Sequence, residues 1–120
     1  MKTRTNVLSS DTLTGDTVKN ISGENLGEIK DLMIDLDTGR VAYAVLSFGG
    51  FMGLGDKLFA IPWQALTVDT NDHSFRLDIP KEKLENAPGF DQDNWPDFAN
   101  REWGNKVYSY YGYKPYWHNN

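Results

Sequence analysis

A glycine-rich stretch in the middle of the sequence has part of the spacing that phosphate-binding loops use. Gly50 and Gly55 are separated by four residues, as in the phosphate loop, where Lys and then Ser or Thr must follow to reach the phosphates and magnesium. Here Asp56, Lys57 and Leu58 follow, which places a carboxylate where a phosphate would lie. The glycine spacing of dinucleotide-binding loops also fails at Leu58. We therefore expect a glycine-rich connection between strands.

A second motif begins like a calcium-binding loop. Asp35, Asp37 and Gly39 alternate as the first ligands of such a loop do, but its sixth position must be Gly and its twelfth Glu. Those positions are held by Arg40 and Leu46. The sequence therefore favours a hairpin turn over residues 37–39.

An acidic segment near the C-terminus could hold a weakly bound surface cation. Asp91, Asp93 and Asp97 lie within seven residues of one another. A solvated loop in which Asp93 or Asn94 caps a turn is the better expectation.

Catalysis by a nucleophile or a transition metal has little support in the sequence. The two histidines, His73 and His118, lie far apart, and there is no cysteine, which excludes disulfides, thiolate zinc sites, iron–sulfur clusters and cysteine nucleophiles. A catalytic triad could be drawn from Ser47, His73 and Asp78, but no nucleophile elbow surrounds the serine. We therefore expect no enzymatic activity, no catalytic residue, no metal site and no cofactor.

The length and charge of the chain limit what its folded form can be. A chain of 120 residues can bury one core, with appendages. Its net charge is −5, whereas a duplex-binding protein needs a basic face. No apolar signal segment follows Lys2 and Arg4, and the longest nearly apolar run, residues 41–52, is shorter than the ~20 residues of a membrane span. We expect a cytoplasmic protein without a nucleic-acid partner or a membrane span, although peripheral contact with a membrane complex stays open.

Turn residues divide the first two-thirds of the chain into short apolar runs. Clusters of Gly, Asn and Asp form turns because Gly and Asn adopt positive φ and Asp bonds its own backbone. Short strands at such spacing are typical of a small antiparallel barrel or a sandwich. The predicted strands are residues 16–20, 26–36, 40–48, 57–61, 66–69 and 74–78.

Two of these strands carry further information. In residues 26–36 the apolar positions change phase near Lys30 and Asp31, which predicts a bend or a bulge of the kind that barrels need. In residues 40–48 both faces are apolar. Such a strand is covered on both sides, either by the barrel and a tail or by another subunit.

Proline residues mark two short helical segments. Pro62 lacks the donor that a strand ladder needs, so residues 62–65 are expected to form one helical turn, with Trp63 in the core. Residues 80–85 are expected to form a short helix with Pro80 at its first position.

The last quarter of the chain differs from the rest in composition. Residues 90–120 hold ten of the sixteen aromatic residues. Because disordered tails are poor in aromatic residues, we expect this tail to be docked and to include a short helix within residues 97–111.

Several motifs together resemble those of the PRC-barrel domain family. After a Gly-x-x-Val start at residues 15–18, the family-like segments are GENLGEIKD at 23–31, DLDTGRV at 35–41, GGFMGLGDK at 49–57 and AIPW at 60–63. Residues 84–91, with Trp95 and Pro96, resemble the segment that follows the barrel in many bacterial members. YYGYKPYW at 110–117 is similar to the end of a stand-alone bacterial subgroup. The resemblance implies a six-stranded β-barrel like that of the photosynthetic reaction-centre H subunit and of the C-terminal domain of a ribosome-maturation factor. Those members bind protein partners, and the family supplies no catalytic residues.

The expected fold is therefore all-β: a small six-stranded PRC-type barrel in residues 1–89, with short helical turns and a docked aromatic tail in residues 90–120. The expected function is a non-enzymatic protein-binding or adaptor module that self-associates as a homodimer. The alternative is a small-molecule or ion sensor with its ligand between the barrel and the tail. Aromatic and apolar side chains suit a partner contact, and the candidate partner-binding residues are Tyr43, Phe48, Phe51, Met52, Leu54, Trp103, Tyr110, Tyr111, Tyr113, Tyr116 and Trp117.

Overall fold

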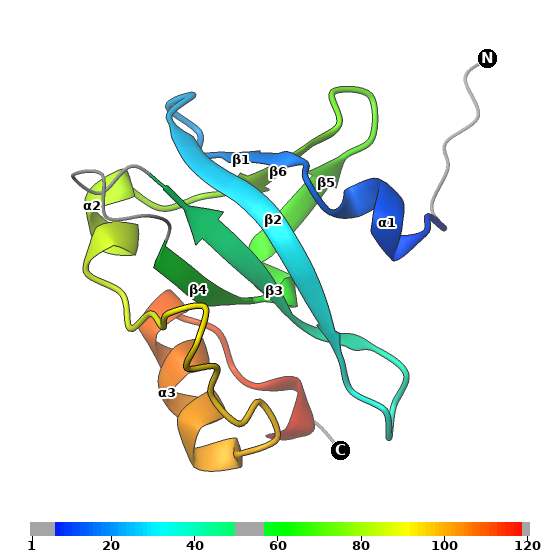
Figure 1. Ribbon diagram of the computed structural model, residues 1–120, viewed down its shortest axis with the longest axis vertical. Helices are drawn as coiled ribbons and strands as arrows, with labels where there is room; N and C mark the ends of the chain where they lie inside the picture. Colours follow the sequence, from blue (N-terminus) through cyan, green and yellow to red (C-terminus); the bar gives the residue numbers. More distant parts are fainter. Residues whose placement is uncertain (1–6, 50–56, 119–120) are drawn as a thin grey trace.

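Six strands form one curled sheet with short helices around it (Figure 1). The computed structural model describes residues 7–49 and 57–118. Every strand that the sequence predicts is present, with ends within two residues of the expected ones. The strands are β1 (Thr17–Lys19), β2 (Asn25–Ile34), β3 (Val41–Phe48), β4 (Lys57–Pro62), β5 (Leu66–Asp69) and β6 (Ser74–Leu77).

The strand order in the sheet is β4-β3-β2-β1-β6-β5. Neighbours pair antiparallel except β1 and β6, which are parallel. The expectation of a purely antiparallel barrel is wrong at this pair. A parallel pair needs a long crossover connection, and the whole of β2 to β5 lies between the two strands along the chain. The ladder pairs of the described residues do not join β4 to β5, so the sheet curls into a half-barrel whose two edge strands are linked by the 3-10 turn η1 (Trp63–Ala65).

The predicted irregularity in the long second strand is confirmed. The register between β2 and β3 shifts between Ile29 and Asp31, and β2 sweeps across the whole molecule (Figure 1). The turn that follows is the expected hairpin: the N–H of Asp35 donates to the carbonyl of Arg40 at 2.8 Å, and the N–H of Gly39 donates to that of Asp35. The side chain of Asp35 also accepts from the N–H of Asp37. The aspartates of the calcium-like motif therefore build a turn.

Strand β3 is covered on both faces, as its sequence indicates. Every residue from Ala42 to Phe48 is buried. Because successive side chains of a strand point to opposite faces, the neighbours Ala42 and Ala44 lie on the face opposite Tyr43. Buried residues of β1, β2, β4 and β6 continue the core, including Val18, Leu26, Ile29, Phe59, Ile61, Phe75 and Leu77.

Trp63 does not occupy the core position expected for it. Its ring packs edge-on against Phe75, with 6.0 Å between ring centroids, but the residue is only partly buried. η1 links two edge strands that do not pair in the described residues, and Trp63 lines a cavity there.

The helices are short except the last. The helix α2 (Lys81–Glu85) follows Pro80, which is its N-cap rather than its first residue. The helix α3 (Arg101–Tyr111) lies within the predicted range of residues 97–111. Its start is fixed by Asn100, whose side chain accepts from the N–H of Trp103 at 3.1 Å. Two elements were not predicted, α1 (Ser10–Leu13), which Ser9 caps, and the 3-10 turn η2 (Tyr116–His118). No helix in the described parts of the chain has the length and apolar character needed to cross a bilayer.

Candidate functional site

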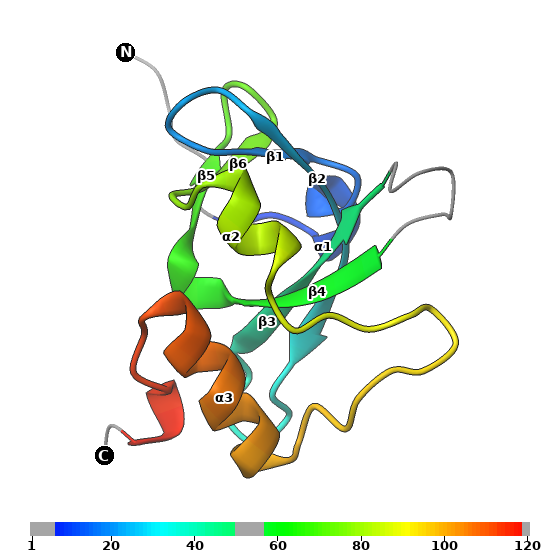
Figure 2. The same ribbon diagram turned by 90° about the vertical axis from the view of Figure 1, so that its left-hand side faces the viewer.

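The C-terminal segment lies beside β3 and β4 in the structure. Helix α3 lies below β4 in both views (Figures 1 and 2). The Tyr108 hydroxyl donates to the carbonyl of Ala42 in β3 at 2.9 Å, and the Tyr110 hydroxyl donates to the carbonyl of Lys83 at 2.6 Å. At the free edge of β4, Leu58 and Phe90 exchange backbone hydrogen bonds of 3.0 and 2.8 Å. These bonds satisfy backbone groups that an edge strand otherwise leaves open.

Aromatic rings from the barrel and from the C-terminal segment form one group, which we call the aromatic cluster. Its centre is Tyr43, whose ring lies 5.4 to 5.6 Å from three others in edge-on or tilted arrangements. These are favourable geometries for aromatic pairs, which gain stability beyond the area they bury. The cluster consists of Tyr43, Phe98, Trp103, Tyr108, Tyr116 and Trp117.

A glycine inside α3 makes the close packing of the cluster possible. A Cβ atom on Gly104 would lie 2.5 Å from the Tyr43 hydroxyl oxygen and 2.7 Å from the Trp117 ring. Glycine weakens a helix interior by about 1 kcal/mol relative to alanine. Gly104 therefore lowers the intrinsic stability of α3 but allows the helix to pack closely against β3.

Two arginines lie over rings at the edge of the cluster. The guanidinium carbon of Arg40 lies 4.6 Å from the centroid of the Tyr116 ring, and that of Arg101 lies 4.6 Å from the centroid of the Trp117 ring. Cation–π contacts of this kind contribute about 0.5–1 kcal/mol at exposed sites. They join the hairpin after β2 and the start of α3 to the last aromatic residues of the chain.

A hydrogen bond between residues far apart in the sequence connects the hairpin after β2 to the C-terminal segment. The Tyr116 hydroxyl donates to the side-chain carboxylate of Asp35. This bond stabilises the ionised carboxylate and lowers the pKa of Asp35. Burial, together with the hydrogen bond to Asp35, raises the pKa of Tyr116 to about 12. Burial is also the main cause that raises the pKa values of Tyr43, Tyr108 and Tyr111.

Replacing Tyr116 by phenylalanine is expected to bring the pKa of Asp35 back up toward its ordinary value of 3.8. Because the folded-state pKa is depressed, the stabilising effect of the ionised carboxylate is present above the unfolded-state pKa. It is lost as the pH falls through the folded-state pKa. A carbon-13 titration of the Asp35 carboxyl group from about pH 5 downward measures both proteins. An identical pKa in the two would show that Tyr116 and Asp35 do not meet in solution.

The predicted partner-binding residues are found in three environments. Tyr43, Phe48, Tyr111 and Tyr116 are buried within the chain, so their rings are not open to a partner in this arrangement. Trp103, Tyr110 and Trp117 are partly buried, and Tyr113 is 39% exposed. Phe51, Met52 and Leu54 lie outside the described residues. The structure thus brings Trp103, Tyr116 and Trp117 into one cluster with Tyr43. It leaves part of four rings facing outward.

The other motifs considered from the sequence take structural roles where they are described. Ser47 is buried in β3, and His73 lies in the turn before β6 with φ of 52°. In the acidic segment, Asp97 accepts from the N–H of Ala99, and the carbonyl of Asp91 accepts from the N–H of Asn94. The side chain of Asp97 therefore caps a turn, as was expected of Asp93 or Asn94, while Asp91 contributes only its backbone carbonyl. Within residues 7–49 and 57–118, no group of three or more His, Cys, Asp or Glu could hold a metal ion. The phosphate-like glycine spacing at Gly50 and Gly55 lies outside the described residues.

A cavity of about 540 Å³ lies between the hairpin after β2 and the C-terminal segment. Its wall combines both signs of charge with rings of the aromatic cluster; among its residues are Asp35, Asp97, Arg101, Tyr116 and Trp117. The sequence did not connect Asp35 with Tyr116 in one site, because the two residues are 81 positions apart and no local pattern links them. This cavity is one place where a ligand between barrel and tail, the alternative raised by the sequence, could lie.

Comparison with known proteins places this arrangement in a family. No curated protein matches the chain. Among solved structures, a protein named as the 16S ribosomal RNA processing protein RimM from Pseudomonas aeruginosa is 22% identical, with a TM-score of 0.43. The match covers 62% of this chain and 45% of the length of that protein. The family model of the PRC-barrel domain matches residues 6–84, which is more than half of the chain and includes all six strands. The chain therefore belongs to the PRC-barrel domain family.

Proposed function

We propose that this chain is a non-enzymatic protein-binding module that self-associates through the outward-facing rings of its C-terminal segment. The observation that carries this proposal is the group of four partly exposed aromatic residues, Trp103, Tyr110, Tyr113 and Trp117. Tyr, Trp and Arg are enriched at protein interfaces and among the residues that dominate binding energy. A symmetric dimer is the commonest closed assembly of soluble proteins.

The charged residues around these rings fit the same role. Arg101 lies over Trp117, and the ammonium nitrogen of Lys83 lies 5.4 Å from the centroid of the Tyr110 ring. A basic rim beside aromatic rings can pair with acidic groups of a second copy, whose net charge is −5. The same net charge argues against direct contact with nucleic acid. The apolar residues Phe51, Met52 and Leu54, which the structure does not describe, remain part of the proposed contact.

The proposal includes an intramolecular position for the tail. Residues 90–120 stay packed on residues 1–89 of the same chain, as an appendage of the barrel and not as a domain of their own. The support is the set of contacts made by Tyr108, Phe90 and Gly104 with β3 and β4. A cytoplasmic location and the absence of enzymatic activity complete the proposed description; both rest on the sequence and on the family.

Replacing Tyr113 by aspartate is expected to weaken self-association at least tenfold, because a charge buried in an interface without a partner is strongly unfavourable. Sedimentation velocity across a wide concentration range measures the dissociation constants. The matched control is Val7→Asp, which introduces the same charge at an exposed apolar residue outside the tail. A full chain that stays monomeric overturns the proposal. If Val7→Asp weakens self-association and Tyr113→Asp does not, the contact between copies lies near Val7 and not at the tail.

The alternative function, a sensor of a small molecule or an ion, is favoured by the cavity between the hairpin and the C-terminal segment. A thermal-shift screen against metal ions and metabolites separates the two functions. A large, saturable rise in Tm that Arg101→Ala removes supports the sensor, because a ligand stabilises the native state by mass action. A concentration-dependent mass without such a rise supports the binding module.

A further inference from the structure

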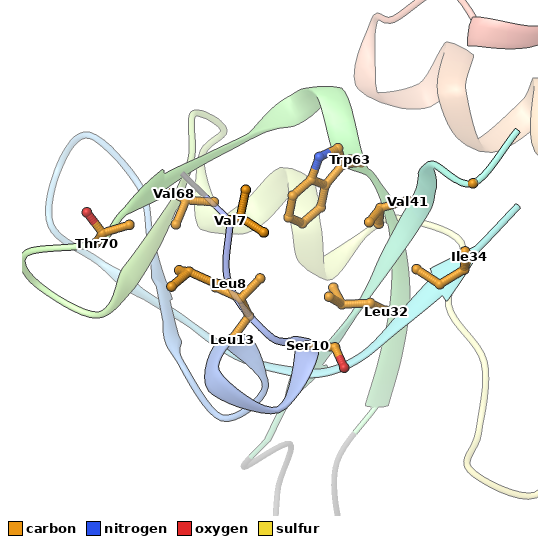
Figure 3. Close-up of a pocket in the computed structure, with 11 residues that line it drawn as sticks. Val7, Leu8, Ser10, Leu13, Leu32, Ile34, Val41, Trp63, Val68 and Thr70 are labelled. Carbon is orange, nitrogen blue, oxygen red and sulfur yellow. The ribbon is translucent and has the colours of Figure 1, made fainter. Parts of the chain in front are cut away.

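A second and larger cavity lies away from the aromatic cluster, between β5 and the neighbouring ends of β2 and β3 (Figure 3). Its volume is about 730 Å³. Trp63 of η1 stands on one side, Leu32 and Val41 on another, and the segment that contains Leu8 and Leu13 forms a third wall. The side chains of these elements point toward a common centre (Figure 3). The cavity is therefore a three-sided hollow and not a flat surface.

The lining of this cavity carries no charge. None of the described residues that line it is Asp, Glu, Lys, Arg or His, although 24% of the chain is charged. Its polar side chains, Ser10 and Thr70, lie toward its edges (Figure 3). An ion transferred into such a hollow would lose its hydration without gaining a partner. The described lining therefore offers an ion no charged partner and favours an uncharged occupant.

Apolar side chains at this cavity face solvent. Val7 is 88% exposed and Ile34 is 48% exposed, and Trp63 is only partly covered. Removing such surface from water is favourable, so an occupant that covers it gains affinity. The volume lies in the range of small-molecule sites, which is about 300–1,000 Å³.

We propose that this cavity binds an uncharged, largely apolar small molecule, with the indole ring of Trp63 as one wall and the segment around α1 as a cover. The class is that of medium-chain alcohols and similar neutral hydrocarbons with one hydrogen-bonding end, which the hydroxyl of Ser10 or of Thr70 can meet at the edge of the hollow. The site is independent of the proposed self-association, because it shares no lining residue with the outward-facing tail rings.

The test compares three probes of equal chain length on the full chain: decanol, decanoate and decylammonium, at neutral pH. Isothermal titration calorimetry is expected to show saturable one-to-one binding of decanol, at least tenfold tighter than that of either ion. Equal affinity for all three, or no binding of decanol, overturns the proposal.

Variants locate the binding. Val68→Asp places a charge in the wall, and Val68→Trp fills the hollow without a charge; both are expected to weaken decanol binding at least tenfold. The matched control Ile21→Asp lies at an exposed apolar residue outside the cavity and is expected to leave binding unchanged. Thermal unfolding shows which variants fold, and retained binding in a folded Val68→Trp variant contradicts the proposal. A further outcome also overturns the proposal: the original chain is a dimer that does not bind decanol, and the Val68→Asp variant is a monomer. The hollow would then be a contact between two copies of the chain.

Discussion

Replacing Gly27 by alanine is expected to lower the free energy of unfolding by about 3–5 kcal/mol. Gly27 has a φ of 117° in β2, a conformation that residues with a side chain rarely adopt. A Cβ atom there would lie 2.1 Å from the backbone carbonyl oxygen of Ser47 in β3. Because that oxygen belongs to the neighbouring strand, the clash can be relieved only by moving β2 away from β3. Urea denaturation measures the loss.

The matched control for this variant is Gly39→Ala. Gly39 also has positive φ, 77°, but a Cβ atom there would meet nothing within 4 Å. The control therefore carries only the backbone penalty, about 1–2 kcal/mol. Equal losses in the two variants would contradict the close approach of β2 and β3 at Gly27.

Replacing Tyr108 by alanine is expected to cost about 3–5 kcal/mol of stability, as the loss of a buried aromatic side chain does. Tyr108 is fully buried, and its ring contacts those of Tyr43, Tyr116 and Trp117. Tyr108→Phe keeps the ring and removes only the hydrogen bond to Ala42, so about 1 kcal/mol is expected for it. Chemical denaturation of the three proteins separates the two contributions.

The control for the Tyr108 variants is Tyr113→Ala, an exchange in the same tail at a residue that is 39% exposed. Its effect is expected to be within about 0.5 kcal/mol, as for most surface substitutions. If Tyr108→Ala is equally harmless, the C-terminal segment is not packed on the barrel in solution.

Local chemistry made most strands predictable. Turn residues and the short apolar runs between them define β3, β5 and β6 within one residue at each end, and the change of phase near Lys30 locates the bulge in β2. These signals depend only on neighbours in sequence. The helix α1 was missed although Ser9 and Thr12 have the spacing of an N-cap, because four residues are too few for a periodic pattern.

Long-range pairings were not predictable in the same way. Nothing in the composition of β1 or β6 shows that they pair in parallel, since strand partners are chosen by the packing of the whole chain. Trp63 was expected in the core for its size and apolar character, but it lies in the turn between two edge strands that do not pair within the described parts of the chain and is only partly buried. The link between Asp35 and Tyr116 is of the same kind, because it joins two segments that only the fold brings together.

The central claim is that the tail packs on its own barrel and presents its outer rings to a second copy. Nuclear Overhauser spectroscopy on an equimolar mixture of isotope-labelled and unlabelled chains tests it most directly. Contacts between chains are predicted at Trp103, Tyr110 or Tyr113, whereas those of Tyr108 with Tyr43 are predicted within one chain only. The absence of any contact between chains, or a Tyr108–Tyr43 contact that joins labelled to unlabelled chains, would contradict the claim.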